Sequence, residues 1–549
     1  MKTKLSGVLL LLSFLLFSSF SVFEDNSASS PGEIAALAFR ITEQMSDEQA
    51  LAQTFMLGWV GAEPSPLILE WIRERNIGGV KIFGWNTDNT KKLAEAVGNL
   101  QKAALDTQFG IPLLVATDQE GGLVRHVKGA TSDTPGNMAI GASGRPMDAY
   151  WTGYYIGKEL ALLGINMNFA PTVDLYTNPG STLIGPRSFG SDPVQAGILG
   201  AAFAKGQRET GIIATAKHFP GHGDTDLDSH GVLPKIEAPF DVLWDRELLP
   251  YRLLTKEKLP AVMTGHLAFP NTPSGQTPAS LSPWFIKDIL RGKIAYRGLV
   301  ITDDLMMNGA TAYAGSLSRA AKQALQAGND IIMLSKTPFL NDAVWTYLIS
   351  SMKEEAEFRE RVRDACRRIL EVKLEFLRGE KKVPYIPDLK KIDAGLSDPE
   401  ANAFFLSLAA RSVTIVKGAE LFPLSAEKAG RVLLAGNFTD FFNAGKSAYP
   451  AAVSYWYSSS QGSEGLLSYA RNADTIIFCL SDRQGSRILQ ELRRLGKRVI
   501  VFSVLNPVYL DDTSWADAAV AVYSYAAESF IAGFSAILSR IPGEGKLPF

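Results

Sequence analysis

Residues 212–230 read IIATAKHFPGHGDTDLDSH, an apolar run that changes abruptly into a polar segment. The run from Ile212 to Lys217 is rich in β-branched residues and predicts a buried strand. The segment from Lys217 to His230 holds three of the five histidines of the chain, and its proline and glycines prevent a continuous helix. A buried strand that leads into a crowded, titratable loop predicts a functional site at the end of that strand.

Similar apolar runs, separated by helical patterns, lie on both sides of this stretch. Helices are predicted over Asp148–Leu163, Pro193–Thr210 and Leu317–Ala327. The eight alternations predict a (β/α)8 TIM-type barrel, with an open doubly wound sheet as the alternative. The predicted strands are Gln53–Leu57, Gly79–Phe83, Leu113–Asp118, Ile165–Ala170, Ile212–Lys217, Ala261–Gly265, Leu299–Asp303 and Asp330–Leu334.

Charged and polar residues follow four of these strands. They are Asp118, Lys217, His266 and Asp303, each at or just after the carboxyl end of its predicted strand. Active sites of TIM barrels are built at this end, from residues that packing alone does not require. We therefore expect these four side chains to share a site.

The chain is long enough for more than one domain. We assign residues 33–380 to the barrel, 381–400 to a linker rich in Lys, Pro and Asp, and 401–549 to a smaller α/β sandwich with a largely parallel sheet. The predicted strands of this second domain are Val413–Val416, Val432–Ala435, Thr475–Leu480, Arg498–Val504 and Ala518–Tyr523, and its predicted helices are Ile488–Leu495 and Glu528–Ser539.

The first 25 residues have the pattern of a secretory signal peptide: two lysines, an apolar run from Val8 to Val22, and small polar residues. We therefore expect export to a periplasm or to the extracellular space. The segment lacks a clear A-x-A cleavage site, so an uncleaved membrane anchor is the alternative. No other apolar segment is long enough to span a membrane.

The overall composition limits the partners of the chain. There are 55 basic and 57 acidic residues, and they form no basic block, which argues against nucleic acid as a partner. Cys366 and Cys479 lie in apolar contexts without metal or redox spacing, so we expect buried free thiols. We expect a monomer without a cofactor or a bound metal.

The polar segments suggest a mechanism. In extended backbone Asp228 and His230 lie on the same side, so the carboxylate can orient and charge the imidazole as a general acid/base dyad. Asp303 is delivered by a stiff strand, although a helix N-cap explains that residue equally well by itself. A fixed carboxylate and a mobile acid suit a two-step displacement at an anomeric carbon, in which the carboxylate forms a covalent glycosyl-enzyme.

Five ordered motifs resemble glycoside hydrolase family 3, over about residues 40 to 340. They are DQEGG at 118–122, GPRSFGSD at 185–192, KHFPGHGDTDLDSH at 217–230, MTGH at 263–266 and the segment 289–303 that ends in Asp303. The Asp-Ser-His loop is similar to that of the bacterial β-N-acetylglucosaminidase, or β-hexosaminidase, branch. The second domain also resembles that family's C-terminal α/β sandwich.

This resemblance implies roles for individual residues. Asp303 is implied as the nucleophile and His230 as the acid/base, with Asp228 as its partner. The implied sugar-binding residues are Asp118, Arg187, Lys217 and His218.

The sequence departs from the family pattern at one place. Members of the family commonly have an arginine eight residues after the DQEGG aspartate. Here His126 occupies that position and Arg125 precedes it. A shift of one residue along a strand reverses the face of a side chain, so Arg125, His126 or neither is expected to contact sugar.

We interpret the chain as an exported, retaining exo-β-N-acetylglucosaminidase that acts on peptidoglycan fragments or chitooligosaccharides. A phosphorylase on the same fold is the main alternative, because a histidine acid/base does not repel phosphate. A metal-dependent hydrolase is disfavoured since Pro220 and Gly221 separate His218 from His222. A non-catalytic sugar-binding protein is disfavoured since Asp303, Asp228 and His230 are all present.

Overall fold

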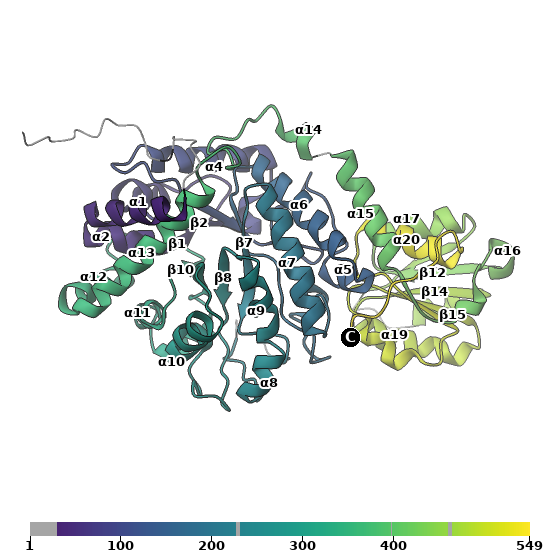
Figure 1. Cartoon of the computed structure of the whole chain (residues 1–549). Helices are drawn as coiled ribbons and strands as arrows, with labels where there is room; N and C mark the ends of the chain where they lie inside the picture. Colours follow the sequence, from purple (N-terminus) through teal and green to yellow (C-terminus); the bar gives the residue numbers. More distant parts are fainter. Residues whose placement is uncertain (1–22, 24–29, 227–230, 397, 459–463) are drawn as a thin grey trace, which may run out of the picture.

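The computed structural model describes residues 23, 30–226, 231–396, 398–458 and 464–549. Within them, eight parallel strands form a closed barrel, and a separate six-stranded sheet follows it (Figure 1). The predicted TIM-type barrel followed by a smaller α/β domain is therefore confirmed. The strands, in the order in which they pair around the barrel, are β1 (Phe55–Gly58), β10 (Ile331–Leu334), β9 (Leu299–Asp304), β8 (Ala261–Thr264), β7 (Ile213–Phe219), β6 (Met167–Asn168), β3 (Leu114–Thr117) and β2 (Gly79–Ile82).

Helices surround this barrel. Several begin with a side-chain cap: Asp192 accepts hydrogen bonds from the first turn of α7, and Ser316 accepts one from the first turn of α11. The barrel helices are α1 (Pro31–Gln44), α2 (Asp47–Gln53), α3 (Pro66–Glu70), α4 (Thr90–Leu105), α5 (Asn137–Ser143), α6 (Pro146–Leu162), α7 (Pro193–Glu209), α8 (Phe240–Asp245), α9 (Leu248–Lys256), a helix at Trp284–Lys293, α10 (Asn308–Ala314), α11 (Leu317–Ala327), α12 (Ala343–Glu354) and α13 (Ala356–Phe376).

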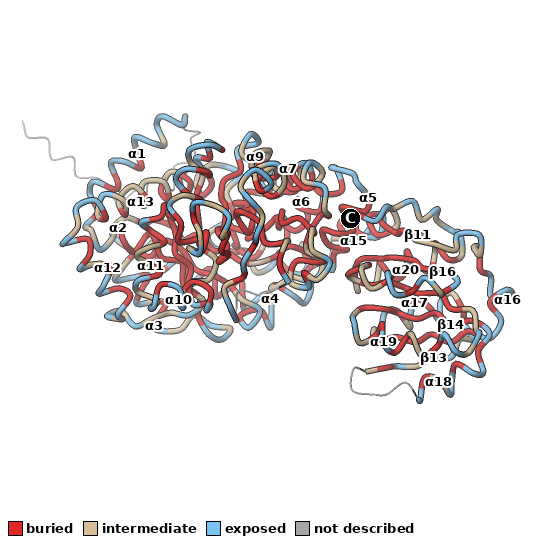
Figure 2. The backbone as a smooth tube through the Cα atoms, turned by 90° about the horizontal axis from the view of Figure 1, so that it is seen from below, coloured by how far each residue is buried: buried red, intermediate tan, exposed pale blue. Residues whose placement is uncertain are grey.

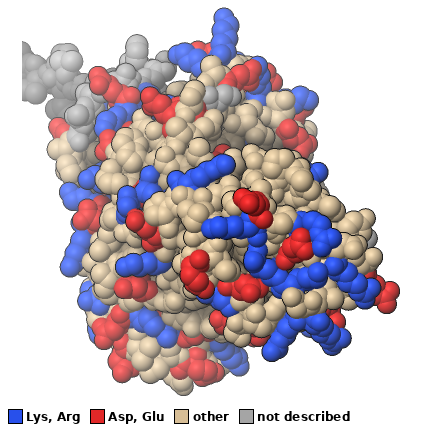
Figure 3. All heavy atoms as spheres, turned by 90° about the vertical axis from the view of Figure 1, so that its right-hand side faces the viewer, with Lys and Arg blue, Asp and Glu red and all other residues tan. Residues whose placement is uncertain are grey.

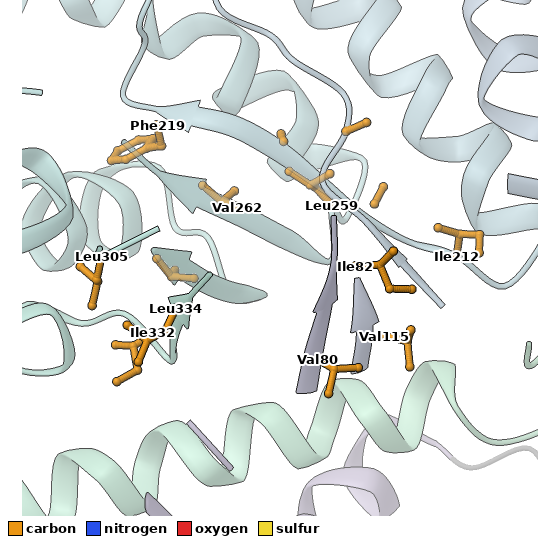
Figure 4. Packing of buried hydrophobic residues seen from close by; sticks show 14 of the residues in the cluster. Val80, Ile82, Val115, Ile212, Phe219, Leu259, Val262, Leu305, Ile332 and Leu334 are labelled. Atoms are coloured by element: carbon orange, nitrogen blue, oxygen red, sulfur yellow. The ribbon is translucent and has the colours of Figure 1, made fainter. Parts of the chain in front are cut away.

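The strands alternate between two apolar layers, because successive side chains point to opposite faces. One layer packs between strands and helices and includes Val80, Val115 and Val262 (Figure 4). The other layer fills the barrel and includes Leu114, Met263 and Ile301. The parity of a residue on its strand therefore decides whether its side chain enters the barrel.

The amino-terminal end of the barrel is closed by α13. Ile369, Val372 and Phe376 of this helix belong to the same cluster as the inward side chains of the strands. Phe23, directly after the apolar run of the sequence, is fully buried in a cluster with α1, α2 and α13. Its carbonyl oxygen lies 3.4 Å from Tyr385 Oη, which also contacts the Leu377 carbonyl oxygen. Phe23 therefore lies at the closed, amino-terminal end of the barrel.

The second domain is a six-stranded sheet between two apolar layers. Its strands pair in the order β11-β16-β15-β14-β12-β13, and β11 runs antiparallel to its neighbour while the other pairs are parallel. Figure 2 shows that the barrel strands and the inner strands of the sheet are buried. The strands are β11 (Thr414–Lys417), β12 (Val432–Gly436), β13 (Val453–Trp456), β14 (Thr475–Leu480), β15 (Arg498–Ser503) and β16 (Ala518–Ala521), and the helices include α17 (Thr439–Ala448), α19 (Arg483–Leu492) and α20 (Ala527–Ile537).

The two domains touch through the last residues of the chain. The amide nitrogen of Lys546 donates to the Ala142 carbonyl oxygen at 3.0 Å, and that of Ser191 donates to the Pro548 carbonyl oxygen at 2.9 Å. The ring of Phe549 packs edge-on against Tyr176 with centroids 5.1 Å apart. This tail therefore fastens the second domain to the barrel.

Three of the strands, β13, β4 and β5, were not expected from the sequence. Strand β13 has half-exposed or exposed side chains at the edge of its sheet, so it lacks the apolar run that identified the other strands. The hairpin of β4 (Gln119–Gly121) and β5 (Val124–Arg125) lies after β3, where positive φ angles at Gly121 and Gly122 allow a turn that other residues disfavour.

The surface and the thiols agree with the composition. On the face shown in Figure 3, basic and acidic side chains intermingle. Cys366 and Cys479 are both buried and free. Among the residues that the structure describes, no helix combines the length and apolarity that crossing a bilayer requires.

Candidate active site

Four charged side chains enter the carboxyl end of the barrel because of their strand parity. Lys81 on β2 alternates with the outward Val80 and Ile82, and Lys217 on β7 follows the inward Ile213 by four residues. Asp303 on β9 follows the inward Ile301 by two. Asp118 follows β3 with the same parity as Leu114 and Ala116. The barrel thus gathers opposite charges in one place.

Three cations and two carboxylates form the centre of this site. Lys217 Nζ lies 2.5 Å from Asp118 Oδ1 and 2.6 Å from Glu120 Oε1. Lys81 Nζ lies 2.6 Å from Asp118 Oδ2. Arg187 binds Glu120 through two parallel hydrogen bonds, from Nε at 2.9 Å and from Nη2 at 2.8 Å. The cations alternate with the acids, so each of the two carboxylates lies between two cations.

This compensation controls the pKa values of the acids. Burial alone would raise the pKa of Asp118, but the adjacent ammonium groups of Lys217 and Lys81 hold it well below its usual range. Burial likewise opposes ionisation of Glu120, and Arg187 and Lys217 still lower its pKa to about 2. Both carboxylates are therefore charged at neutral pH and accept hydrogen bonds only.

His218 is fixed by Asp174, which follows β6. Asp174 Oδ2 lies 2.7 Å from His218 Nδ1, and the carboxylate also accepts from the His218 and His222 backbone amides. The peptide bond between Lys217 and His218 is cis, and the pairing of β7 with β8 changes register here. Lys217 contacts Asp118 and Glu120, whereas the adjacent His218 contacts Asp174.

Asp303 stands at the carboxyl end of β9 beside two histidines. Its Oδ1 accepts a hydrogen bond from the Asp304 amide at 2.8 Å. Burial opposes ionisation, yet the proximity of His218 and His266 and this hydrogen bond lower the pKa of Asp303 below its ordinary value. His266 is itself held by Ser280 Oγ at 2.7 Å and by the Asp304 carbonyl oxygen at 3.0 Å. Asp303 is therefore a rigid carboxylate, ionised at neutral pH.

The Asp304 carboxylate has a different environment. Its Oδ1 accepts from the Met306 amide at 3.0 Å and from the Ser335 amide at 3.1 Å. These bonds join the ends of β9 and β10. Of the two adjacent aspartates, Asp304 thus fixes the turn after β9, and Asp303 is left to face the site.

The loop after β7 is anchored where it starts. Gly223 passes so close to the Leu175 carbonyl oxygen that a Cβ atom would lie 1.5 Å from it. Asp224 Oδ2 accepts from Arg246 Nη2 at 2.6 Å, and Arg246 also binds Glu247. Asp228 and His230, the predicted acid/base dyad, lie outside the described residues.

Arg125 and His126 turn to opposite sides. Arg125 Nη1 donates to the carbonyl oxygens of Thr131 and Ser132 at 3.0 Å each, and its guanidinium also pairs with Asp133. His126 instead has its Nδ1 3.7 Å from Asp118 Oδ2. The guanidinium of Arg125 thus supports the loop 131–133, and a sugar contact by Arg125 stays a prediction.

Three members of the site were not singled out in the sequence. Lys81 could have been recognised as a charge in the middle of the apolar run GGVKIF, and Glu120 stands inside the DQEGG motif. Asp174 gives no comparable signal, because its distance from His218 along the chain conceals their contact. All three are buried and ion-paired, which the sequence alone does not reveal.

Together these groups can bind a polyhydroxylated ligand beside a nucleophilic carboxylate. Asp118 can accept hydrogen bonds from hydroxyls, and the cations can donate to oxygen atoms. Asp303 is held in a fixed direction from a strand, as covalent catalysis requires. A closed parallel barrel with such a site at the carboxyl ends of its strands belongs to the class of TIM-barrel enzymes.

Residues 49–372 match the domain described as "Glycosyl hydrolase family 3 N terminal domain". The chain therefore belongs to glycosyl hydrolase family 3, as its motifs predicted. It is 37% identical to the beta-hexosaminidase A of Pseudoalteromonas piscicida over 285 residues, which are 49% of this chain and 47% of that protein. It is 36% identical to the beta-hexosaminidase of Tolumonas auensis over 282 residues, 51% of this chain and 81% of that protein.

A solved structure extends the similarity to both domains. The family 3 beta-N-acetylglucosaminidase from Paenibacillus sp. str. FPU-7 superimposes with a TM-score of 0.82 and 27% sequence identity. The match covers 92% of this chain and 98% of that one. The barrel and the second sheet thus form the same two-domain architecture in both proteins.

Proposed function

We propose that this chain is a retaining exo-β-N-acetylglucosaminidase that removes terminal N-acetylglucosamine by a two-step displacement. Its place in family 3 and its beta-hexosaminidase relatives support a glycosidase of this type. The observation that carries the mechanism is the rigid, ionised Asp303 beside the Asp118 cluster. In the first step Asp303 attacks the anomeric carbon, and the bond to the leaving oxygen breaks.

The second catalytic group is proposed from the sequence. His230, oriented by Asp228, protonates the leaving oxygen in the first step. In the second step it removes a proton from water, which attacks the anomeric carbon and releases Asp303. The loop that carries this dyad is anchored at its start, from Gly223 to Asp224.

The terminal sugar is held by the buried charge cluster. We assign hydroxyl binding to Asp118 and oxygen contacts to Arg187, Lys217 and His218. Because an exo-acting enzyme must recognise the whole terminal sugar, a dense set of donors and acceptors next to the nucleophile fits this assignment. Chitooligosaccharides and peptidoglycan fragments are the proposed substrates, and export through residues 1–25 is the proposed route to them.

A trapping experiment tests the nucleophile. A 2-fluoro sugar substrate slows hydrolysis of the covalent intermediate, so mass spectrometry of the wild-type peptides should place the sugar on Asp303. Asp303→Asn should fold normally and take up no label. Asp304→Asn is the matched control, because its amide oxygen still caps Met306 and Ser335, and labelling should persist at Asp303. Labelling at another residue, or labelling of Asp303→Asn, would contradict the assignment.

A separate experiment shows whether water or phosphate receives the sugar. Product analysis in phosphate buffer distinguishes water from phosphate, since phosphorolysis would release N-acetylglucosamine 1-phosphate. We expect free N-acetylglucosamine as the sole product. Accumulation of the sugar phosphate would make the phosphorylase the correct function on the same site.

A further inference from the structure

Lys81 and His126 form a contact that the proposed mechanism leaves unused. Lys81 is 1% exposed and its ammonium has three N–H donors. The groups around it are the Ile82 carbonyl oxygen at 2.9 Å, Asp118 Oδ2 at 2.6 Å and His126 Nδ1 at 3.3 Å. Three acceptors match three donors, so the ammonium is fully satisfied if His126 Nδ1 accepts.

The position of His126 is fixed by its backbone. Its amide nitrogen donates to the Asp118 carbonyl oxygen at 3.0 Å, and its carbonyl oxygen accepts from Thr87 Oγ1 at 2.7 Å. The ring lies 5.7 Å from that of Phe83, measured between centroids. The imidazole is therefore held beside Asp118, with its side chain 27% exposed.

The charge of Lys81 selects one tautomer of the ring. An ammonium has no lone pair, so a proton on His126 Nδ1 would point at the N–H groups of Lys81, 3.3 Å away, and its nearest acceptors would be the Ile82 carbonyl oxygen and Asp118 Oδ2, at 3.4 and 3.7 Å. With the Nδ1 lone pair directed at Lys81, the proton of the neutral ring must lie on Nε2. In the competing arrangement Nδ1 carries the proton and donates it to the Ile82 carbonyl oxygen. These two atoms are 3.4 Å apart, slightly farther than Nδ1 is from Lys81 Nζ.

The surrounding charges also keep the ring neutral. Burial, followed by the charge of Lys81, lowers the pKa of His126 to about 4, while Asp118 acts in the opposite direction and Lys217 adds to the lowering. Burial lowers the pKa of Lys81, and the ionised carboxylate of Asp118 opposes this lowering and supports the charge on the ammonium. At neutral pH the ring is thus an uncharged donor through Nε2, which has no hydrogen-bond partner among the described residues.

We propose that Lys81 holds His126 as its neutral Nε2–H tautomer, so that this N–H donates to the oxygen of a sugar hydroxyl whose own proton is accepted by Asp118. The assignment deepens the proposed glycosidase and rests on it for the identity of the ligand. His126 is then a sugar-binding residue, and Lys81 is a positioning residue that acts through His126 and Asp118.

The tautomer is tested without any substrate. In the full-length enzyme with ¹⁵N-labelled histidines, the ring nitrogens of His126 should appear unprotonated at Nδ1 and protonated at Nε2, unchanged between pH 5.5 and 8. The signals are assigned by their loss in His126→Gln. A proton on Nδ1, or titration in the ordinary range of histidine, overturns the proposal irrespective of what the enzyme hydrolyses.

Two substitutions at His126 test the donor. Glutamine places its amide nitrogen near the position of Nε2, whereas asparagine reaches only the position of Nδ1. With an aryl N-acetyl-β-glucosaminide, His126→Asn should raise KM about tenfold, the equivalent of one lost hydrogen bond, with a smaller change in kcat. His126→Gln should recover most of that loss. Equal KM values for both variants contradict the contact.

A substitution at Lys81 tests whether this residue controls the tautomer of His126. Lys81→Met frees His126 to donate from Nδ1 toward Asp118, which removes the Nε2 donor from the neutral ring. KM should therefore be high at pH 8 and recover as the pH falls and the ring becomes protonated on both nitrogens. The wild type should show no such change, and Lys322→Met is the control for loss of a lysine elsewhere.

A double variant at Lys81 and His126 distinguishes control of the His126 tautomer from a structural effect of the Lys81 substitution. An amide cannot exchange tautomers, so Lys81→Met with His126→Gln should lose the pH dependence of KM. Persistence of that dependence in the double variant would show that it arises elsewhere and would overturn the proposal. If Lys81→Met fails to fold, the ¹⁵N spectrum and the pair of His126 variants still decide the question.

Discussion

At the scale of residues, the site depends on buried carboxylates that stay charged because hydrogen-bond donors surround them. Asp174 is the clearest case, since it is 1% exposed and accepts hydrogen bonds from His218 and from two backbone amides. Burial would raise its pKa, but His218 and these hydrogen bonds lower it. Its role is to orient another side chain of the site.

Replacement of Asp174 by asparagine should damage both stability and activity. One acceptor oxygen becomes an NH₂ group that faces the N–H donors of His218 and His222. The free energy of unfolding should fall by about 2–4 kcal/mol, the cost of a broken buried charged contact. Chemical denaturation measures this loss, and kcat/KM should decrease with it.

Asp192→Asn provides the matched control for this substitution. Asp192 caps α7 at the surface, where asparagine is an equally good cap. The free energy of unfolding of Asp192→Asn should differ little from that of the wild type. Equal stability of the two variants would show that the Asp174 contacts contribute nothing.

At the scale of elements, α13 carries an unusual buried cation at the closed end of the barrel. Lys373 is fully buried, and Nζ donates to Gln53 Oε1 at 2.9 Å. Burial lowers the pKa of Lys373 to about 7. The neutral amine is thus the form that the packed helix prefers.

The free energy of unfolding should therefore depend on pH in the range above pH 7. Between the folded pKa near 7 and the ordinary value near 10.5, the unfolded chain binds a proton that the folded chain does not. The free energy of unfolding should rise with pH across this window. Lys373→Met should abolish the rise and make the protein more stable at pH 7, by about 1–3 kcal/mol after loss of the Gln53 hydrogen bond.

Denaturation of both proteins at pH 7 and pH 9.5 measures this difference. Lys102→Met, at an exposed position near the end of α4, controls for the removal of a positive charge. A pH dependence in Lys373→Met equal to that of the wild type would contradict the prediction.

The elements of the barrel could be predicted because each strand is a short, buried apolar run. The eight predicted runs coincide with the eight barrel strands, with boundaries that differ by a few residues. Strand β13 could not be predicted, since an edge strand with exposed side chains has no such pattern. The hairpin β4–β5 is too short for a periodic signal.

The site could be predicted only in part. The position of a residue at the end of a strand can be read from the local sequence. This property was sufficient to predict Asp118, Lys217, His266 and Asp303 as members of the site. Contacts between distant segments, such as that of Asp174 with His218, require the fold. The separate orientations of Arg125 and His126 follow from the hairpin, so the sequence left them open.

At the scale of the whole molecule, the chain terminus joins the domains next to the site. Pro548 lies so close to Gly141 and Gly190 that a Cβ on Gly190 would contact its carbonyl oxygen at 2.2 Å. Tyr176, which packs on Phe549, also accepts a hydrogen bond from Asn506 at 2.9 Å. These contacts support the segment that carries Arg187.

Deletion of residues 546–549 should uncouple the domains. Differential scanning calorimetry should show a lower first transition and two resolved transitions where the intact chain melts as one unit. KM should rise because the segment around Arg187 loses support. Phe549→Ala is the milder comparison, and a truncated chain that melts as the intact one would contradict a fastening role for the tail.

The burial of Phe23 has a consequence for how the molecule is oriented. Its cluster lies at the end of the barrel opposite Asp303, beneath α13. Phe23 and the candidate active site therefore lie at opposite ends of the barrel. Immobilisation of the enzyme through its amino end should consequently leave the entrance open to large, insoluble glycans.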